Sequence, residues 1–164
     1  MADMVKNINI VPFSDEYASA VEALVIEAWT PIRESYRREL GDELYLMAFG
    51  DWKRKKVDRV LFLMREGHGY VALVDGEVAG FIHYSVGGDR ISAEVGNNAV
   101  SSRFRGRGIA QRMYSFIEEK MREEGVKYVT VVTGLDEGHA PARRAYEKAG
   151  FDKGLESVRY FKMI

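Results

Sequence analysis

Residues 101–112, SSRFRGRGIAQR, combine four arginines with two glycines, and these residue types can bind a phosphate group. Guanidinium groups supply positive charge, and a glycine has no side chain to keep an anion away from the backbone N–H groups beside it. Two kinds of site fit this composition. One is an Arg/Gly patch that holds nucleic acid, and the other is a loop whose backbone holds a phosphate.

The position of the stretch favours the second kind of site. Residues 91–100, ISAEVGNNAV, predict a strand, and the apolar residues Ile109, Met113, Phe116, Ile117 and Met121 recur at helical spacing. The first turn of a helix has unpaired N–H groups and the positive end of the dipole, so it binds anions readily. We therefore expect a phosphate-binding loop that enters a helix near Gly106 or Arg107.

The overall composition limits the classes of function that remain. Lys and Arg total 24 against 25 Asp and Glu, so the net charge is −1 and the strongly basic surface of a general polyanion binder is missing. The chain has 164 residues and is 46% apolar, which predicts one compact folded unit. It contains no cysteine, which excludes disulfides, thiolate metal sites and a cysteine nucleophile.

Strands and helices are predicted along the whole chain. The second half reads as a strand, a helix and a strand, and this order predicts a parallel pair of strands joined by a crossover helix. The expected elements are a strand at 7–13, a helix after Ser14, two or three short helices from Pro31 to Arg65 broken at Gly41 and Gly50, two strands around the Asp75-Gly76 turn, the strand and helix on either side of the loop, a strand at 126–132, a helix closed by Gly150, and a last strand at 157–164.

Several motifs in this order resemble those of the GNAT superfamily of N-acyltransferases. RFRGRGIA at 103–110 is similar to the family's R/Q-x-x-G-x-G/A acyl-CoA motif. AEVGNNAV lies before it, VKYVTVV lies after the helix, and AYEKAGF at 145–151 is similar to the family's second motif. The resemblance covers about residues 70–164 well and the first 65 residues only in outline.

The resemblance implies an α/β (α+β) fold with a mixed, mostly antiparallel central sheet. That sheet would have about six to seven strands, splayed between the fourth and fifth, with about four flanking helices. Residues 1–164 would form a single N-acetyltransferase domain, with an acceptor-side region at about 6–66 and an acyl-CoA core at about 70–164.

The resemblance also implies acetyl-CoA as co-substrate, without a metal ion. The pantetheine arm would pair with the strand at Asn98, Ala99 and Val100. His139 stands seven residues before Tyr146, where the family commonly has a cofactor-binding Asn. The pyrophosphate would accept hydrogen bonds from the N–H groups of Arg105, Gly106, Arg107, Gly108, Ile109 and Ala110.

Two residues are the expected catalytic groups. Tyr146 occupies the family's general-acid position, and a phenol is a suitable proton donor to a thiolate; the alternative is a purely packing role. Glu94 stands where the family often carries a base that works through water; the alternative is an outward-facing strand residue. His83 and His139 are other candidate bases, and a strand bulge near Gly96 to Asn98 would polarise the thioester carbonyl.

The acceptor amine is left open by the sequence. Glu34, Tyr36 and Asp42 could bind a cationic amine, while three arginines could bind a carboxylate or phosphate, unless all of them form a solvated helix face. These arginines are Arg33, Arg37 and Arg38. The acceptor could be a small amine, an amino acid, an aminoglycoside-like drug or a peptide amine.

Other interpretations of the chain are a CoA-binding module without catalysis and, less favoured, a nucleic-acid binder that uses RFRGRG with KRKK at 53–56. The N-terminus MADMVKNINIV lacks the apolar core of a signal peptide, and no stretch is long enough for a membrane span. We therefore expect a cytoplasmic protein with neither a membrane nor a nucleic-acid partner. The last strand could support a homodimer.

Overall fold

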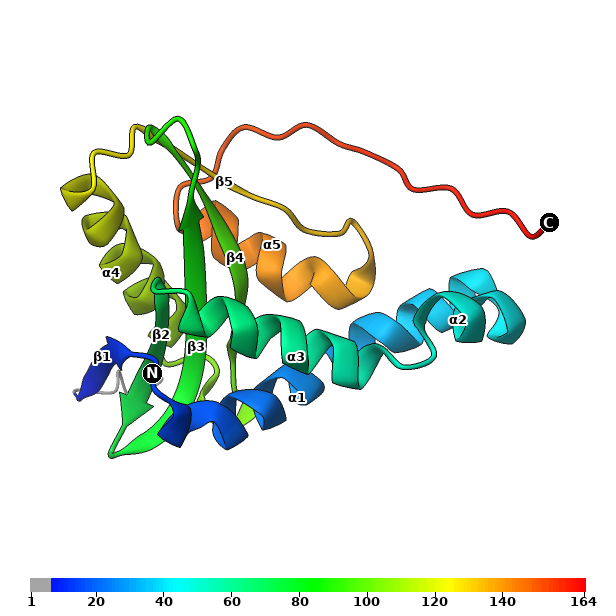
Figure 1. Ribbon diagram of the computed structural model, residues 1–164, viewed down its shortest axis with the longest axis horizontal. Helices are drawn as coiled ribbons and strands as arrows, with labels where there is room; N and C mark the ends of the chain where they lie inside the picture. The colour runs from blue at the N-terminus through cyan, green and yellow to red at the C-terminus, as the bar shows by residue number, and fades with distance from the viewer. Residues whose placement is uncertain (1–6) are drawn as a thin grey trace.

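A five-stranded sheet forms the centre of the computed structural model, which describes residues 7–164 (Figure 1). The strands lie side by side in chain order, antiparallel from β1 to β4 and parallel between β4 and β5. They are β1 (Ile8–Pro12), β2 (Gly69–Val74), β3 (Glu77–Val86), β4 (Ser92–Val100) and β5 (Tyr128–Val131). The predicted mixed, mostly antiparallel sheet is confirmed, with fewer strands than predicted.

Among the described residues, three α-helices precede β2, and two follow the loop at 101–108. They are α1 (Ala18–Leu40), α2 (Asp42–Phe49), α3 (Trp52–Arg65), α4 (Ile109–Glu123) and α5 (Ala140–Lys148). The predicted breaks at Gly41 and Gly50 are confirmed. Pro31, however, lies inside α1 and does not begin a new helix. A proline removes one backbone hydrogen bond, and buried residues on both sides of it, Val25 and Ile32 among them, keep this helix packed.

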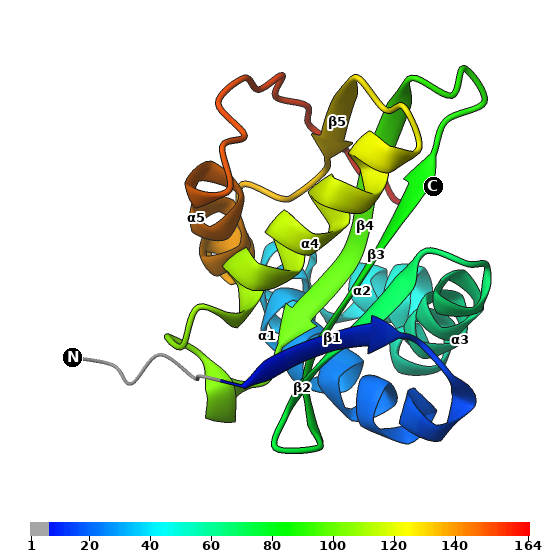
Figure 2. The same cartoon turned by 90° about the vertical axis from the view of Figure 1, so that its left-hand side faces the viewer.

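The helices cover both faces of the sheet (Figure 2). On one face, α1 and α3 pack Val25, Val60 and Met64 against Val71 and Phe81 of the sheet. On the other face, α4 buries four of the five apolar residues predicted for it, Ile109, Met113, Ile117 and Met121, each about 1% exposed, while Phe116 is partly buried against the same core. Strand alternation supplies both faces at once, because neighbouring residues such as Val71 and Ala72 point in opposite directions.

The sheet opens between β4 and β5. The two strands pair only from Ser92 opposite Tyr128 to Val95 opposite Val131. Beyond this point, β4 continues from Gly96 to Val100 with β3 on one side and no strand on the other among the described residues. The predicted splay is therefore confirmed, and it leaves a length of strand edge available to a ligand.

The prediction of a last strand at 157–164 is wrong. Residues 151–164 form neither helix nor strand and run as an extended segment toward α2 (Figure 1). Leu155, Val158 and Tyr160 are exposed, and Phe161 contacts the ring of Phe49 with a centroid separation of 6.1 Å. The alternation in SVRYFKMI expresses a local preference, whereas a strand also needs a hydrogen-bonded neighbour.

The structure adds one observation on membrane association. Across residues 7–164, no helix combines the length and apolar character needed to cross a membrane. Residues 1–6, part of the N-terminal stretch considered above, lie outside the described residues.

Candidate active site

A large pocket lies where the sheet opens, with a volume of about 670 Å³. Its wall is built from α1, α3, β4, the loop before α4, and the segment that leads into α5. The predicted site residues that line it are Glu94, Asn98, Ala99, Val100, Arg105, Ala110, His139 and Tyr146. Side chains far apart in the sequence therefore meet at the unpaired edge of β4.

The loop before α4 presents a run of unpaired backbone donors. Among the described residues, no N–H group from Arg105 to Ala110 has a hydrogen-bond acceptor. Gly106 and Gly108 have φ values of 76° and 80°, and Gly108 is the N-cap of α4. The helix begins two to three residues later than predicted because these left-handed conformations precede its first turn. A phosphate group fits this cradle of N–H groups.

The arginines of the loop have separate roles in the structure. Arg103 forms an ion pair with Glu77, and Arg107 lies over the ring of Phe104, 5.4 Å from its centroid. Arg105 is exposed and lines the pocket. Phe104 is only 7% exposed, so it offers no face to a nucleic-acid base. The nucleic-acid hypothesis loses the stacking residue that it required.

Tyr146 lies at the end of a hydrogen-bonded chain of side chains. The hydroxyl of Tyr114 donates to Asn98 Oδ1 at 2.8 Å, and Asn98 Nδ2 donates to Tyr146 Oη at 3.3 Å. Burial raises the pKa of Tyr146 above its ordinary value, although hydrogen bonding with Asn98 and Tyr114 opposes this effect. The phenol therefore keeps its proton at neutral pH, and its oxygen already accepts one hydrogen bond, so the O–H remains able to donate.

Tyr114 is a functional candidate that no sequence motif indicated. Its ring is 3% exposed and lies 5.8 Å from the ring of Tyr146 in an edge-on arrangement. Burial raises its pKa, and the nearby Tyr146 adds to the shift. Its spacing from Ile117 and Met121 on α4 is helical, so periodicity could have placed it on the buried face. No sequence pattern could have shown its bond to Asn98.

Glu94 lies in the pocket wall on β4, between the buried residues Ala93 and Val95. Strand alternation turns its side chain to the face opposite theirs. The residue is exposed, and its carboxylate forms no hydrogen bond or ion pair within residues 7–164. Its carboxylate can therefore contact a ligand in the pocket directly or through water.

His83 packs against a bulge in β4. The pairing of β3 with β4 shifts between Ile82 and Tyr84, opposite Gly96 and Asn97. The backbone N–H of Asn97 donates to His83 Nε2 at 3.0 Å, so this nitrogen carries a lone pair and the ring is neutral. Burial lowers the pKa of His83 to about 4, assisted by the charge of Lys56. His83 supports the bulge, and its lone pair is not available to a substrate.

Gly96 allows this close contact, and Gly96→Ala is expected to destabilise the fold. A Cβ at this position would lie 2.0 Å from His83 Cε1, so the ring or the strand must move. We expect a loss of about 2 kcal/mol in the free energy of unfolding, measured by urea denaturation. Gly88→Ala is the matched control, since a Cβ there has no heavy atom within 4 Å. Equal stability of the two variants would contradict the packing described for His83.

The titration of His83 predicts a pH dependence of stability. Its pKa in the folded protein, about 4, lies below the unfolded value of about 6.5, so the unfolded chain binds more protons between these values. Stability from this residue is present above pH 6.5 and is lost as the pH falls toward 4. Between pH 7 and pH 5, wild type should lose on the order of 2 kcal/mol more than His83→Gln in urea unfolding. Parallel losses would disprove a neutral, buried His83.

His139 lies at the N-terminus of α5 and lines the pocket. Its Nδ1 is 2.6 Å from Asp136 Oδ2, and Arg143 holds the same turn by donating to the carbonyl oxygens of Gly134 and Asp136. This pairing orients the ring. His139 therefore lies at the site, and its contact with Asp136 was not predicted from the sequence.

The acceptor candidates on α1 separate clearly. Arg33 and Tyr36 line the pocket, whereas Glu34, Arg37 and Arg38 are exposed and lie outside it. Arg37 pairs with Asp42 at 2.6 Å on the surface. Part of the charged segment is thus a solvated face, as one alternative held, and part of it faces the site.

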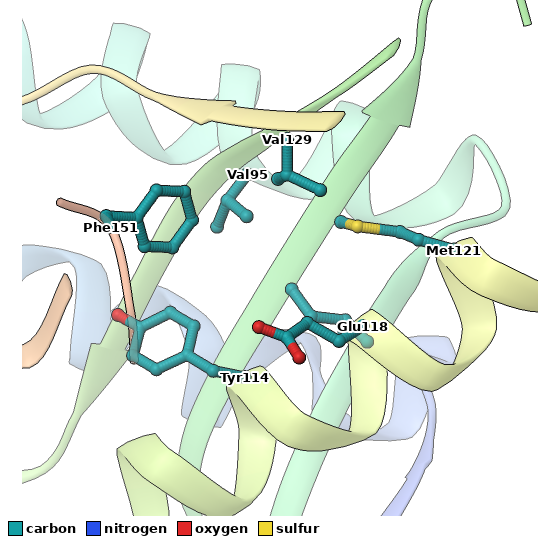
Figure 3. A pocket seen from close by; sticks show the side chains of 7 residues that line it. Val95, Tyr114, Glu118, Met121, Val129 and Phe151 are labelled. Carbon is teal, nitrogen blue, oxygen red and sulfur yellow. The ribbon is translucent and has the colours of Figure 1, made fainter. Parts of the chain in front are cut away.

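A second cavity lies between α4 and the start of the gap in the sheet (Figure 3). Val95, Val129 and Phe151 line one side, and Tyr114 and Met121 of α4 line the other. Its volume is about 20 Å³, which is enough for one water molecule and too small for a substrate. The larger pocket is therefore the candidate active site.

The chain is similar in sequence to one protein family and in fold to several solved structures. Residues 26–151 match the Acetyltransferase (GNAT) family. No curated protein sequence matches the chain. Among solved structures, Ard1 from Thermoplasma volcanium is 25% identical, with a TM-score of 0.66, covering 90% of this chain and 84% of its own.

Two further solved structures show the same fold at lower identity. The aminoglycoside 6'-N-acetyltransferase AAC(6')-Ih from Acinetobacter baumannii is 16% identical, with a TM-score of 0.66 and coverage of 96% of this chain and 99% of its own. The PaiA N-acetyltransferase from Thermoplasma acidophilum, in complex with coenzyme A, is 16% identical, with a TM-score of 0.66 and coverage of 89% and 90%.

Proposed function

Since the chain belongs to the acetyltransferase (GNAT) family and is therefore an acyltransferase, we propose that it transfers an acetyl group from acetyl-CoA to a primary amine by direct attack. One observation supports acetyl-CoA as the co-substrate. The open edge of β4 lines the same pocket as Arg105 and Ala110, the first and last residues of the run with unpaired N–H groups. An extended amide-bearing arm joined to a pyrophosphate matches this pair of features.

The residues of the cradle fit the co-substrate by their chemistry. Asn98, Ala99 and Val100 would pair with the pantetheine amides along the strand edge, and the loop N–H groups would hold the pyrophosphate. The first turn of α4 adds the positive end of its dipole. Acetyl-CoA supplies an activated acyl group as a thioester, and the protein has to position that group and move two protons.

Tyr146 and Glu94 are the proposed proton-transfer groups. Tyr146, with its pKa raised by burial, is protonated at neutral pH and donates its phenolic proton to the departing thiolate. Glu94, exposed in the pocket wall, takes a proton from the attacking amine through a water molecule. His139, held by Asp136, is the second candidate for this base. His83 is not a candidate, because its Nε2 accepts from Asn97.

The proposal is tested by a screen of primary amines with acetyl-CoA, with release of free thiol as the readout. Amino acids, polyamines, aminoglycosides and short peptides belong in the screen. Thiol release that depends on an amine supports the proposal. A thermal shift with acetyl-CoA but no amine-dependent thiol release would favour the CoA-binding module without catalysis. If RNA released the protein from immobilised CoA, the nucleic-acid hypothesis would be favoured instead.

A further inference from the structure

Arg33 lines the candidate active site, and one of its donors has no partner among the described residues. Its guanidinium lies over the rings of Phe49, Tyr36 and Trp52, with centroid distances of 4.7, 5.4 and 5.7 Å. Its Nε is buried and has no hydrogen-bond acceptor among the described residues. A buried donor without a partner is costly, and native structures rarely leave one unless a ligand or water satisfies it. The aromatic rings hold the guanidinium in place beside the pocket.

Lys56 adds a second cation to the same wall. Its Nζ donates to Asn97 Oδ1 and lies 4.3 Å from the centroid of the Trp29 ring. Within residues 7–164, no carboxylate forms an ion pair with Lys56 or Arg33. Burial lowers the pKa of Lys56 to about 8, and the charges of Arg33 and Arg59 contribute to this shift. This wall therefore carries positive charge that the protein does not neutralise.

The pocket also has acidic groups on different elements. Glu94 on β4 and Glu137 before α5 both line it, and both are exposed. These carboxylates suit an ammonium or amine group, whereas Arg33 and Lys56 suit an anion. The pocket thus carries groups of both charges. Trp29 and Ile32 supply apolar surface in the same pocket.

We infer that the acceptor is a primary amine that also carries a carboxylate, with the carboxylate bound by Arg33 and the amine on the side of Glu94. This inference rests on the proposed acetyl transfer. A planar guanidinium with a free N–H edge is matched to a carboxylate, and Lys56 reinforces the attraction. A polycation would bring like charges against Arg33 and Lys56, so this pocket disfavours aminoglycosides.

The first experiment measures binding and does not depend on turnover. N-acetyl-L-leucine and N-acetyl-L-leucinamide resemble products and differ only in the anionic group. Isothermal titration of each into the CoA-loaded protein should give tighter binding of the acid, at least about tenfold. Equal affinity, or no binding of either probe, would overturn the inference. Tighter binding of the phosphonate analogue than of N-acetyl-L-leucine itself would overturn the carboxylate and would indicate an acceptor with a phosphate-like group.

Variants then assign the preference to Arg33. Arg33→Gln should abolish the difference between acid and amide, while Arg38→Gln, an exposed residue on the same helix, should preserve it. A preference that survives in Arg33→Gln would overturn the assignment. Should Arg33→Gln fail to fold, Lys56→Gln provides the second variant, with a reduced preference expected and an unchanged one counting against the site.

Turnover separates this inference from the proposed function. The value of kcat/KM should be higher with L-leucine as acceptor than with L-leucinamide. The aminoglycoside sisomicin should give little thiol release. Acid-selective binding without thiol release from any amine would leave the anion site standing and refute the acetyl transfer. Thiol release with leucinamide or sisomicin equal to that with leucine would refute the anion site and leave the acetyl transfer standing.

Discussion

Tyr146→Phe should lower kcat for amine acetylation by about 100-fold or more and leave the affinity for acetyl-CoA nearly unchanged. The substitution removes only the hydroxyl, which receives a hydrogen bond from Asn98 and would supply the proton to the departing thiolate. The ring continues to pack against Tyr114 and Phe151, with centroid distances of 5.8 and 6.0 Å. Steady-state kinetics and titration with acetyl-CoA measure the two quantities separately.

Tyr114→Phe is the matched control for this prediction. Tyr114 is buried beside Tyr146, and its hydroxyl donates to Asn98, so its loss loosens the chain of hydrogen bonds without removing the proposed proton donor. We expect a decrease in kcat of about tenfold or less and a stability cost of about 1 kcal/mol. Equal losses of kcat in both variants would assign both tyrosines a packing role and would contradict Tyr146 as the acid.

Gly108→Val should weaken the binding of acetyl-CoA at least about tenfold, and more than Arg105→Ala does. Gly108 has a φ of 80°, which a β-branched residue adopts only with strain, and a Cβ placed there has no heavy atom of a non-adjacent described residue within 4 Å. The damage therefore comes from a shifted backbone and from a side chain that fills the cradle. Arg105→Ala removes one exposed charge and leaves the N–H groups in place. Isothermal titration with acetyl-CoA measures both effects.

Gly125→Val provides the control for backbone strain. Gly125 follows α4, has a φ of 86°, and a Cβ at this position would likewise have no heavy atom within 4 Å. Its substitution should lower stability to a similar extent and leave acetyl-CoA binding unchanged. A larger loss of affinity in Arg105→Ala than in Gly108→Val would mean that guanidinium charge, and not the backbone, dominates phosphate binding.

Local patterns predicted much of the fold. The helical spacing of α4 correctly placed Ile109, Met113, Ile117 and Met121 on its buried face. The Asp75-Gly76 turn was also predicted, and both residues have positive φ values. The importance of the loop glycines was also predictable. Glycine has no side chain, and this property alone permits the positive φ values and the close approach of a ligand to the backbone.

Features that depend on distant partners could not be predicted in the same way. The segment 157–164 has strand-like alternation but no strand beside it among the described residues. On α1, helical spacing puts Tyr36 and Arg37 three and four residues after Arg33, so all three share one side of the helix. Only the structure shows that Arg37 forms a surface ion pair with Asp42, whereas the Arg33 guanidinium lies over aromatic rings.

Transfer of the acetyl group from acetyl-CoA to an amine can be measured in a single reaction mixture. The protein, acetyl-CoA and a mixture of L-amino acids and simple alkylamines are incubated, and free thiol and acetylated amine are quantified in the same samples. Acetyl transfer should yield one acetylated amine for each thiol released, and both signals should fall together in Tyr146→Phe. Thiol release that is independent of added amine, or no release above spontaneous hydrolysis, would contradict it.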